Sequence, residues 1–86
     1  MKILNYNIFL RPEPEGGYTV LVPSLPGCIT YGKDIAEARA MAQDAIKGYV
    51  HVLKQEGEPV PTDDQSIVTS VQITSRSVRR KRRAYA

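Results

Sequence analysis

The stretch LVPSLPGCITYGKDIAEA, residues 21–38, decides how this chain folds. It begins at the end of YTVLV, residues 18–22, whose alternating aromatic and branched side chains predict a strand. PSLPG then predicts a turn, and CITYG predicts a further short strand. Asp34, followed three residues later by Glu37, is typical of a capped helix start. The stretch therefore predicts a corner that joins two strands and leads directly into a helix.

Another alternating segment lies N-terminal to this corner. In LNYNIFLR, residues 4–11, apolar side chains fall on one side at Leu4, Tyr6, Ile8 and Leu10. A period of two with aromatic and branched residues predicts a first strand. The following PEPEGG predicts a hairpin loop, because its prolines cannot donate to a ladder and its glycines readily adopt positive φ. We therefore expect residues 4–22 to form a β-hairpin.

After Asp34 the apolar residues follow a helical period. The expected inward-facing stripe and its two flanking positions are Ile35, Ala38, Ala42, Ile46, Tyr49, Leu53, Ala45 and Val50. Gly57, with Pro59 and Pro61 beyond it, predicts the end of the helix. About twenty helical residues span about 30 Å, which is enough to lie across three or four strands.

The segment SIVTSVQITS, residues 66–75, alternates again, with Ile67, Thr69, Val71 and Ile73 on one face. It predicts a fourth strand, which the helix would return parallel to a neighbour. The predicted fold is α+β, in the order β-β-β-α-β, with a single mixed sheet of four strands and one helix packed on one face. Residues 1–75 form the predicted domain, and residues 76–86 form a basic, disordered tail.

Charge divides the 86 residues unevenly. Residues 1–75 hold six Lys or Arg and nine Asp or Glu, a net −3, whereas the six cations after residue 75 face no acid, a net +6. A single cysteine excludes an internal disulfide framework and suits a reducing cytosol. The N-terminal MKILNYNIFL fits neither a signal peptide nor a membrane span. We expect a cytoplasmic domain that forms at least a homodimer, because a small sheet leaves edges and an open face.

The residues that could support catalysis do not converge. Cys28 belongs to the predicted sheet, whereas His51, the one histidine, falls on the outward side of the helix. Free cysteine is usually a small buried hydrophobe, and one Cys with one His is too few for a structural zinc site. None of the nine acids lies within a predicted strand, so no carboxylate cluster for metal or acid–base chemistry is expected. We predict no catalytic residue, no metal site and no cofactor.

Residues 16–61 together resemble the HicB family of antitoxins from toxin–antitoxin systems. The family pattern is a strand that ends near Pro, a Leu-Pro-Gly-Cys turn, a Thr-x-Gly and an Ala-rich helix closed by Gly and Pro. The matching positions are Tyr18, Pro23, Leu25, Pro26, Gly27, Cys28, Thr30, Gly32, Glu37, Ala38, Ala45 and Pro59. The resemblance implies a partial ribonuclease-H-like fold, with the last strand beside the first and without that fold's metal-binding carboxylates.

The resemblance also implies a partner, a HicA-like toxin, which is a small basic ribonuclease whose catalytic histidine the antitoxin covers. The acidic body suits a basic partner. We expect the toxin to contact the exposed sheet and turn around Tyr18, Pro23 and Ser24, although Ser24 replaces an acid common in the family. Two alternatives stay open: an orphan domain of this fold without a toxin, and a residual metal-dependent nuclease.

The tail RSVRRKRRAYA, residues 76–86, stands where many relatives carry a separate DNA-binding domain. Eleven residues are too few for such a domain. The tail cations can contact phosphates without reading sequence, and they are Arg76, Arg79, Arg80, Lys81, Arg82 and Arg83. A solvated tail that aids solubility, a DNA-binding arm and a segment for protein contacts or degradation all remain open interpretations.

Overall fold

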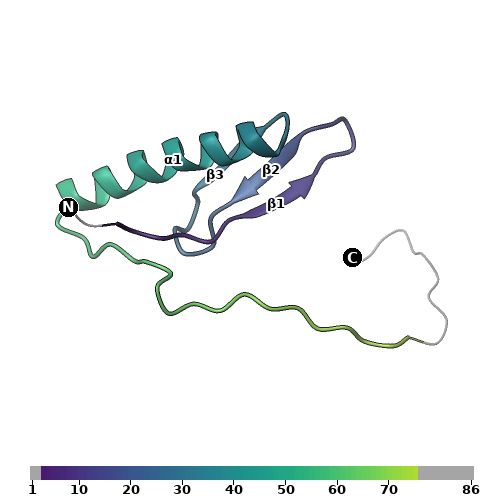
Figure 1. Cartoon of the computed structure of the whole chain (residues 1–86). Helices are drawn as coiled ribbons and strands as arrows, with labels where there is room; N and C mark the ends of the chain where they lie inside the picture. Colours follow the sequence, from purple (N-terminus) through teal and green to yellow (C-terminus); the bar gives the residue numbers. More distant parts are fainter. Residues whose placement is uncertain (1–2, 76–86) are drawn as a thin grey trace.

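A computed structural model describes residues 3–75 of the chain. The element order is β1 (Phe9–Pro12), β2 (Tyr18–Leu21), β3 (Ile29–Gly32) and α1 (Ile35–Gln55), as Figure 1 shows. β1 pairs with β2 and β2 with β3, both antiparallel, so that the sheet order follows the chain order. The predicted hairpin, corner and helix are therefore confirmed, but the first strand, predicted over residues 4–11, begins only at Phe9, and residues 4–8 form no strand.

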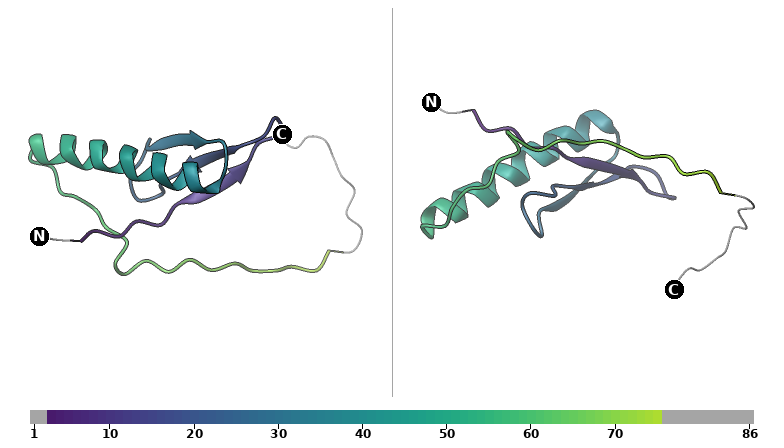
Figure 2. Two further views of the ribbon diagram at one scale, coloured as in Figure 1. Left: turned by 45° about the horizontal axis from the view of Figure 1, so that its top comes forward. Right: turned by 90° about the horizontal axis from the view of Figure 1, so that it is seen from below.

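The helix covers one face of the sheet and leaves the other open. α1 lies over β3 and, to a smaller extent, over β2 (Figures 1 and 2). The register aligns Leu10, Val20 and Thr30 across the three strands, and Val20 packs against Ala38 and Ala42 of the helix. Because side chains alternate along a strand, the neighbouring row points to the opposite face.

The core consists of two adjoining clusters. One contains Val20 and the two buried alanines of the helix, and the other contains Val22, Leu25, Cys28 and Val50. The predicted helical stripe is buried or half-buried except at Ile35, which is exposed. The prediction for Ile35 was wrong, because this first helical residue precedes the point at which the helix meets the sheet.

That meeting point is the contact between Gly32 and Ala38. A Cβ on Gly32 would lie 2.3 Å from the backbone nitrogen of Ala38, so the strand and the helix approach as closely as backbone allows. Glycine at this position has no side chain to separate them. The start of α1 is therefore held tightly against the end of β3.

The corner between β2 and β3 is closed by its own backbone. Val22 N–H donates to the Cys28 carbonyl (3.1 Å), Leu25 N–H to Val22 (3.0 Å) and Cys28 N–H to Leu25 (2.9 Å). Gly27 supplies a φ of +82°, which the turn requires and which only glycine adopts without strain. The Leu25 side chain is fully buried beneath this turn. The corner therefore contributes the Leu25 side chain to the core.

Both helix ends follow the predicted chemistry. The Asp34 carboxylate accepts from Glu37 N–H (2.8 Å), and the Glu37 carboxylate accepts from Lys33 N–H (2.6 Å). At the other end Gly57 takes a φ of +69°, and Glu58 N–H donates to the Leu53 carbonyl (2.9 Å). This 6→1 bond after a left-handed glycine is a Schellman ending.

The predicted fourth strand is not part of this sheet. Residues 66–75, hereafter the arm, form no strand, and every one of them is exposed. In Figure 1 the arm runs beneath the sheet, apart from it. Among the described residues the sheet is three-stranded and wholly antiparallel, so the predicted mixed sheet of four strands was wrong in that respect.

A turn at Asp63 joins the body to the arm. Asp63 N–H donates to the Asn5 carbonyl (3.0 Å), and Asn7 N–H donates to the Asp63 carboxylate (2.8 Å). Asn5 and Asn7 are in the same phase as Phe9, which pairs with β2, so Asp63 lies on the side of the chain that β2 occupies farther along. A strand that continued from Asp63 would therefore meet β2. The Asp63 carbonyl accepts from Ser66 N–H (3.1 Å) and closes the turn, beyond which the arm runs apart from the sheet.

Candidate binding surfaces

No group of three or more His, Cys, Asp or Glu side chains that could hold a metal ion occurs within residues 3–75. Cys28 is buried in the core, where burial raises the pKa of its thiol, and His51 is exposed on the helix. The interpretation of Cys28 as packed core is therefore confirmed. No helix in the described part of the chain has the length and apolar character to cross a membrane.

The uncovered side of the sheet carries an apolar row, hereafter the open face. Phe9, Leu21 and Ile29 are paired across the three strands by the register, and all point away from the helix. Phe9 and Ile29 are more than half exposed. The next row contains Tyr31, whose hydroxyl donates to the Gly16 carbonyl (2.9 Å). The open face is a continuous apolar strip, the kind of surface that marks an interaction site.

A groove of about 680 Å³ lies between the helix and the outer side of β3; we call it the β3 groove. Ile29, Val52 and Leu53 supply apolar lining, and the two charged residues among those that line it are Asp44 and Glu56. Ile29 also belongs to the open face, so the two surfaces are continuous. Apolar side chains bordered by carboxylates suit a partner with basic side chains around a hydrophobic centre.

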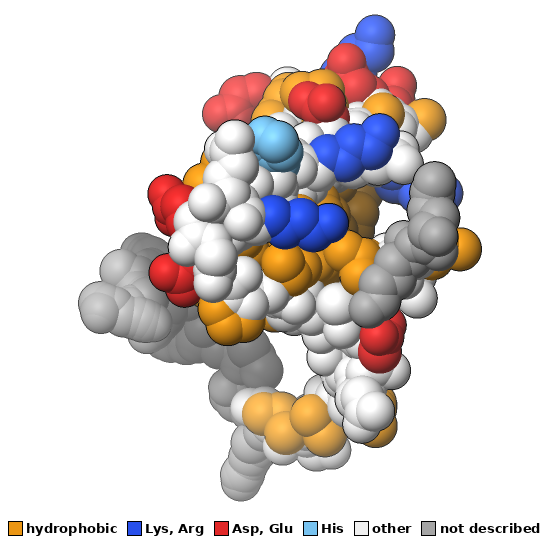
Figure 3. Space-filling view, turned by 90° about the vertical axis from the view of Figure 1, so that its left-hand side faces the viewer, with side chains coloured by type: hydrophobic (Ala, Val, Ile, Leu, Met, Phe, Trp, Pro, Cys, Tyr) orange, Lys and Arg blue, Asp and Glu red, His pale blue; other side chains and the backbone are white. Residues whose placement is uncertain are grey.

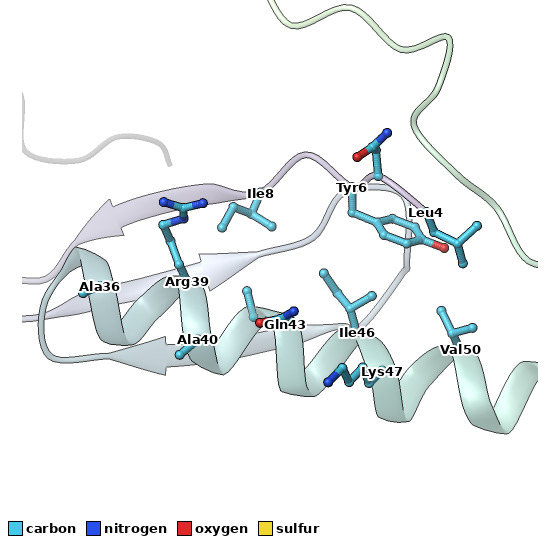
Figure 4. Close-up of a pocket in the computed structure, with 12 residues that line it drawn as sticks. Leu4, Tyr6, Ile8, Ala36, Arg39, Ala40, Gln43, Ile46, Lys47 and Val50 are labelled. Atoms are coloured by element: carbon cyan, nitrogen blue, oxygen red, sulfur yellow. The ribbon is translucent and has the colours of Figure 1, made fainter. Parts of the chain in front are cut away.

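A second groove, of about 920 Å³, lies between the opposite side of the helix and residues 4–8; we call it the β1 groove. In Figure 4, Arg39 and Ile46 point from α1 towards the side on which Ile8 and Tyr6 lie. The charged residues among those lining it are Arg39 and Lys47. In Figure 3 basic side chains border a hydrophobic area on the body of the molecule. The two grooves therefore flank one helix with opposite charge.

The Asp63 carboxylate accepts three hydrogen bonds, more than any other side chain within residues 3–75. It accepts from the hydroxyls of Ser24 and Ser66 and from Asn7 N–H. The hydrogen bond from Ser24, followed by that from Asn7, lowers the pKa of the Asp63 carboxyl. The neighbouring Tyr6 hydroxyl donates to the Pro61 carbonyl (2.5 Å), and burial followed by the charge of Asp63 raises the pKa of Tyr6. These contacts fix the root of the arm to the body.

The structure places the three residues expected to contact the toxin in different surroundings. Tyr18 is half-buried beside the core cluster on the helix side of β2. Pro23 is exposed in the corner, and Ser24 beside it is bonded to Asp63. The structure thus brings Pro23 and Ser24 together and separates Tyr18 from them. The tail cations lie outside the described residues; they are Arg76, Arg79, Arg80, Lys81, Arg82 and Arg83.

Sequence reasoning predicted an open face on the sheet but missed its apolar row, and it missed the role of Asp63, although each left a signal. Phe9, Leu21 and Ile29 fall in the second phase of each alternating strand, so apolar residues occupy both faces of the sheet. Two apolar phases predict a second covered surface. The sequence of residues 63–66, Asp-Asp-Gln-Ser, is typical of a turn closed by an Asp side chain.

The described residues define a small α+β domain with an apolar open face and two grooves of opposite charge. The family model for HicB-like antitoxins of bacterial toxin–antitoxin systems matches residues 6–76. This match covers most of the chain, and the protein belongs to that family. The resemblance seen in residues 16–61 is therefore confirmed over a longer span.

The chain is also similar to individual proteins of three organisms. A UPF0150 protein of Thermoplasma acidophilum is 36% identical over 66 residues, which cover 77% of this chain and 96% of the relative. A UPF0150 protein of Synechocystis is 38% identical over 63 residues, or 73% and 80% of the two chains. The antitoxin HicB of Escherichia coli K12 is 34% identical over 58 residues, or 67% of this chain but 42% of that antitoxin. The match to the named antitoxin thus spans less than half of its length.

Proposed function

We propose that this protein is a non-enzymatic antitoxin that binds and neutralises a small basic ribonuclease of the HicA type in the cytoplasm. Family membership supports the antitoxin role. The observation that carries the rest is the β3 groove, where Asp44 and Glu56 border apolar side chains that continue onto the open face. A basic toxin gains charge attraction at the rim and apolar burial at the centre.

The proposed contact surface is centred on Ile29, which belongs to both the open face and the β3 groove. Pro23, which is exposed in the adjoining corner, extends it. Tyr18 and Ser24 remain in the proposal as residues behind this surface, since Ser24 holds the corner to Asp63. The proposal also includes self-association into a homodimer or larger oligomer.

The test begins with the gene beside the one for this chain, if it encodes a basic protein of about 60–90 residues, the range in which small domains fold. Co-expression of the two should restore growth that the basic protein alone arrests, and the two should purify together. Magnesium-dependent cleavage of RNA by the purified antitoxin would contradict the proposal in favour of a residual nuclease. Failure to bind or rescue would favour an orphan domain.

A matched pair of variants locates the surface. Ile29 and Ile35 have nearly equal exposure, 59% and 54%, but only Ile29 lies in the proposed contact. Ile29→Glu should weaken toxin binding by roughly 100-fold, because an unpaired carboxylate would be buried at the centre of the contact. Ile35→Glu should leave affinity within about twofold, as expected for a residue outside the contact. Equal effects of the two substitutions would exclude this surface.

Charge at the rim is tested separately. Asp44→Asn with Glu56→Gln should slow association with the basic toxin, most strongly at low salt, because rim charges steer encounter. Glu15→Gln, in the exposed β1–β2 loop, is the control for a simple loss of negative charge. If the loop variant slows association as much as the groove pair does, general charge rather than the groove governs binding.

We further propose that the tail binds operator DNA for autoregulation, through Arg76, Arg79, Arg80, Lys81, Arg82 and Arg83. If all six contact phosphates, log K should fall with log[salt] at a slope of roughly −5. Deletion of residues 76–86 should abolish DNA retention and leave folding and toxin binding intact. Equal DNA binding by the truncated protein at low salt would contradict this role.

A further inference from the structure

We infer that the arm is a fourth strand for a second copy of this chain. In a dimer each arm adds to the free edge of β1 in its partner and lays its apolar side chains in the partner's β1 groove. This exchange deepens the self-association that forms part of the proposed function and rests on that part alone. Four observations support it: the pattern of the arm, the free edge, the charge of the groove and the turn at Asp63.

The arm has the composition of a strand with one face buried against another surface. Its sequence, SIVTSVQITS, alternates and contains no charged residue. Ile67, Val71 and Ile73 share one face and are 87–90% exposed. In Figure 3 hydrophobic side chains at the bottom of the view stand apart from those of the body. A neutral, apolar, extended segment of this kind pairs with a sheet edge when one is within reach.

The body offers a free edge along β1, a strand of four residues, and along the residues that lead into it. β1 pairs with β2 on one side, and no other strand within residues 3–75 pairs with its outer side. Residues 3–12, which lead into and include β1, number ten, as do residues 66–75. Ten extended residues span about 33 Å. The β1 groove lies beneath this edge on the helix side, where a strand added to β1 would place its alternate side chains.

The charge of the β1 groove selects a neutral occupant. Arg39 and Lys47 line it, so a basic toxin would meet like charge there. An uncharged strand meets no such repulsion, and the long stems of Arg39 and Lys47 can lie across it while their charged ends stay in water. The acidic β3 groove stays free for the toxin, so the two partners occupy opposite sides of α1.

The turn at Asp63 separates the arm from its own body. Three donors hold the Asp63 carboxylate, and the Asp63 carbonyl is taken by Ser66 N–H. These bonds hold Asp63 on the side of residues 5–7 that β2 occupies farther along, so they leave the outer edge of β1 free. Within residues 3–75 that edge is unpaired and the arm is exposed, so a second copy can cover both.

Substitutions on the two faces of the arm test this exchange in the full chain. The unaltered protein should have the mass of a dimer by sedimentation equilibrium. Val71→Lys places a charge on the face that enters the groove and should weaken dimerisation at least tenfold. Gln72→Lys, on the neighbouring residue and the opposite face, should leave the dimer intact. Circular dichroism should show the same helix content in all three proteins, since neither residue contacts the body in one copy.

Cysteine pairs locate the arm. One copy carries Val71→Cys and the other carries a cysteine at Ala36, Ala40 or Gln43, which line the β1 groove about one turn apart. Mixed copies should form a disulfide between chains at one of these positions. Native Cys28 is buried and does not compete in the folded protein.

Three results would overturn the exchange. The first is a monomer at every concentration up to the solubility limit. The second is equal dimerisation by the Val71→Lys and Gln72→Lys proteins. The third is a disulfide only within a chain when both cysteines are placed in one copy, which would show that the arm folds onto its own body. No toxin is present in these experiments, so their failure is separate from a failure of toxin binding.

Discussion

β2 and the arm have the same kind of sequence and opposite surroundings. In both, branched or aromatic residues recur at every second position, yet Val20 in β2 is completely buried while Val71 in the arm is 90% exposed. β2 has a strand on each side and the helix across one face. The arm follows a turn that directs it away from the sheet. Alternation therefore identifies a segment able to form a strand, and the availability of an edge decides whether it does so.

The same substitution in both segments tests this comparison most strongly. Val20→Ala should lower the free energy of unfolding by about 2–3 kcal/mol at every protein concentration, because it removes buried methyl groups and leaves a cavity. Val71→Ala should cost less than about 0.5 kcal/mol at concentrations where the protein is monomeric. Urea denaturation over a range of protein concentrations measures both. A large loss from Val71→Ala in the monomer would show that the arm packs on its own body.

A substitution at the contact between Gly32 of β3 and Ala38 of the helix should give the next largest loss of stability. Gly32→Ala should destabilise the protein by about 2 kcal/mol, because the new Cβ would overlap the backbone of Ala38 and push the helix off β3. Thermal unfolding followed by circular dichroism measures the change. A neutral result would mean that helix and strand can separate at this point without cost.

Asp63 stands at the branch between the folded body and the arm. Asp63→Asn should cost about 1 kcal/mol near neutral pH through weakened hydrogen bonds. The pKa of the Asp63 carboxyl is lowered in the folded state, so its contribution is present above the ordinary value of about 4 and is lost as pH falls through the folded value. The unfolding free energies of the two proteins should converge as the pH falls below the folded-state pKa of Asp63.

The exposed Asp64 provides the control for this measurement. Asp64→Asn should cost less stability than Asp63→Asn near neutral pH, because Ser24, Asn7 and Ser66 donate to Asp63 and not to Asp64. If Asp63→Asn and Asp64→Asn gave the same profile, the bonds around Asp63 would not stabilise the root of the arm.

The smallest expected effect is a gain in stability from a substitution on the uncovered surface of the helix. A Cβ on Gly48 would meet no atom within 4 Å, in contrast to Gly32. Gly48→Ala should therefore raise stability by about 0.5–1 kcal/mol through helix propensity alone. Thermal unfolding of the Gly48→Ala and Gly32→Ala proteins, measured together, should show a gain in stability for the first and a loss for the second. A loss at Gly48 would indicate that another chain packs closely against this position.

Much of the fold could be predicted from the sequence because its signals are local. The Asp34 cap, the Gly57 ending and the turn at Gly27 depend on residues within one turn of each other. The fourth strand was predicted wrongly, because pairing depends on a distant edge. For the same reason the continuity of Phe9, Leu21 and Ile29 could not be known until the register aligned three strands.

The sequence by itself determined the order of the first three strands and the helix, the burial of Cys28 and the family. Each follows from short-range propensity, apolar period or a contiguous motif. Only the tertiary structure decided that the helix lies over β3 rather than β1, which creates one acidic and one basic groove beside it. It also decided that Asp63 ends the pairing with residues 5–7 and leaves the arm uncovered. These outcomes depend on which of several residues distant in the sequence come together and form hydrogen bonds, and only folding brings those residues together.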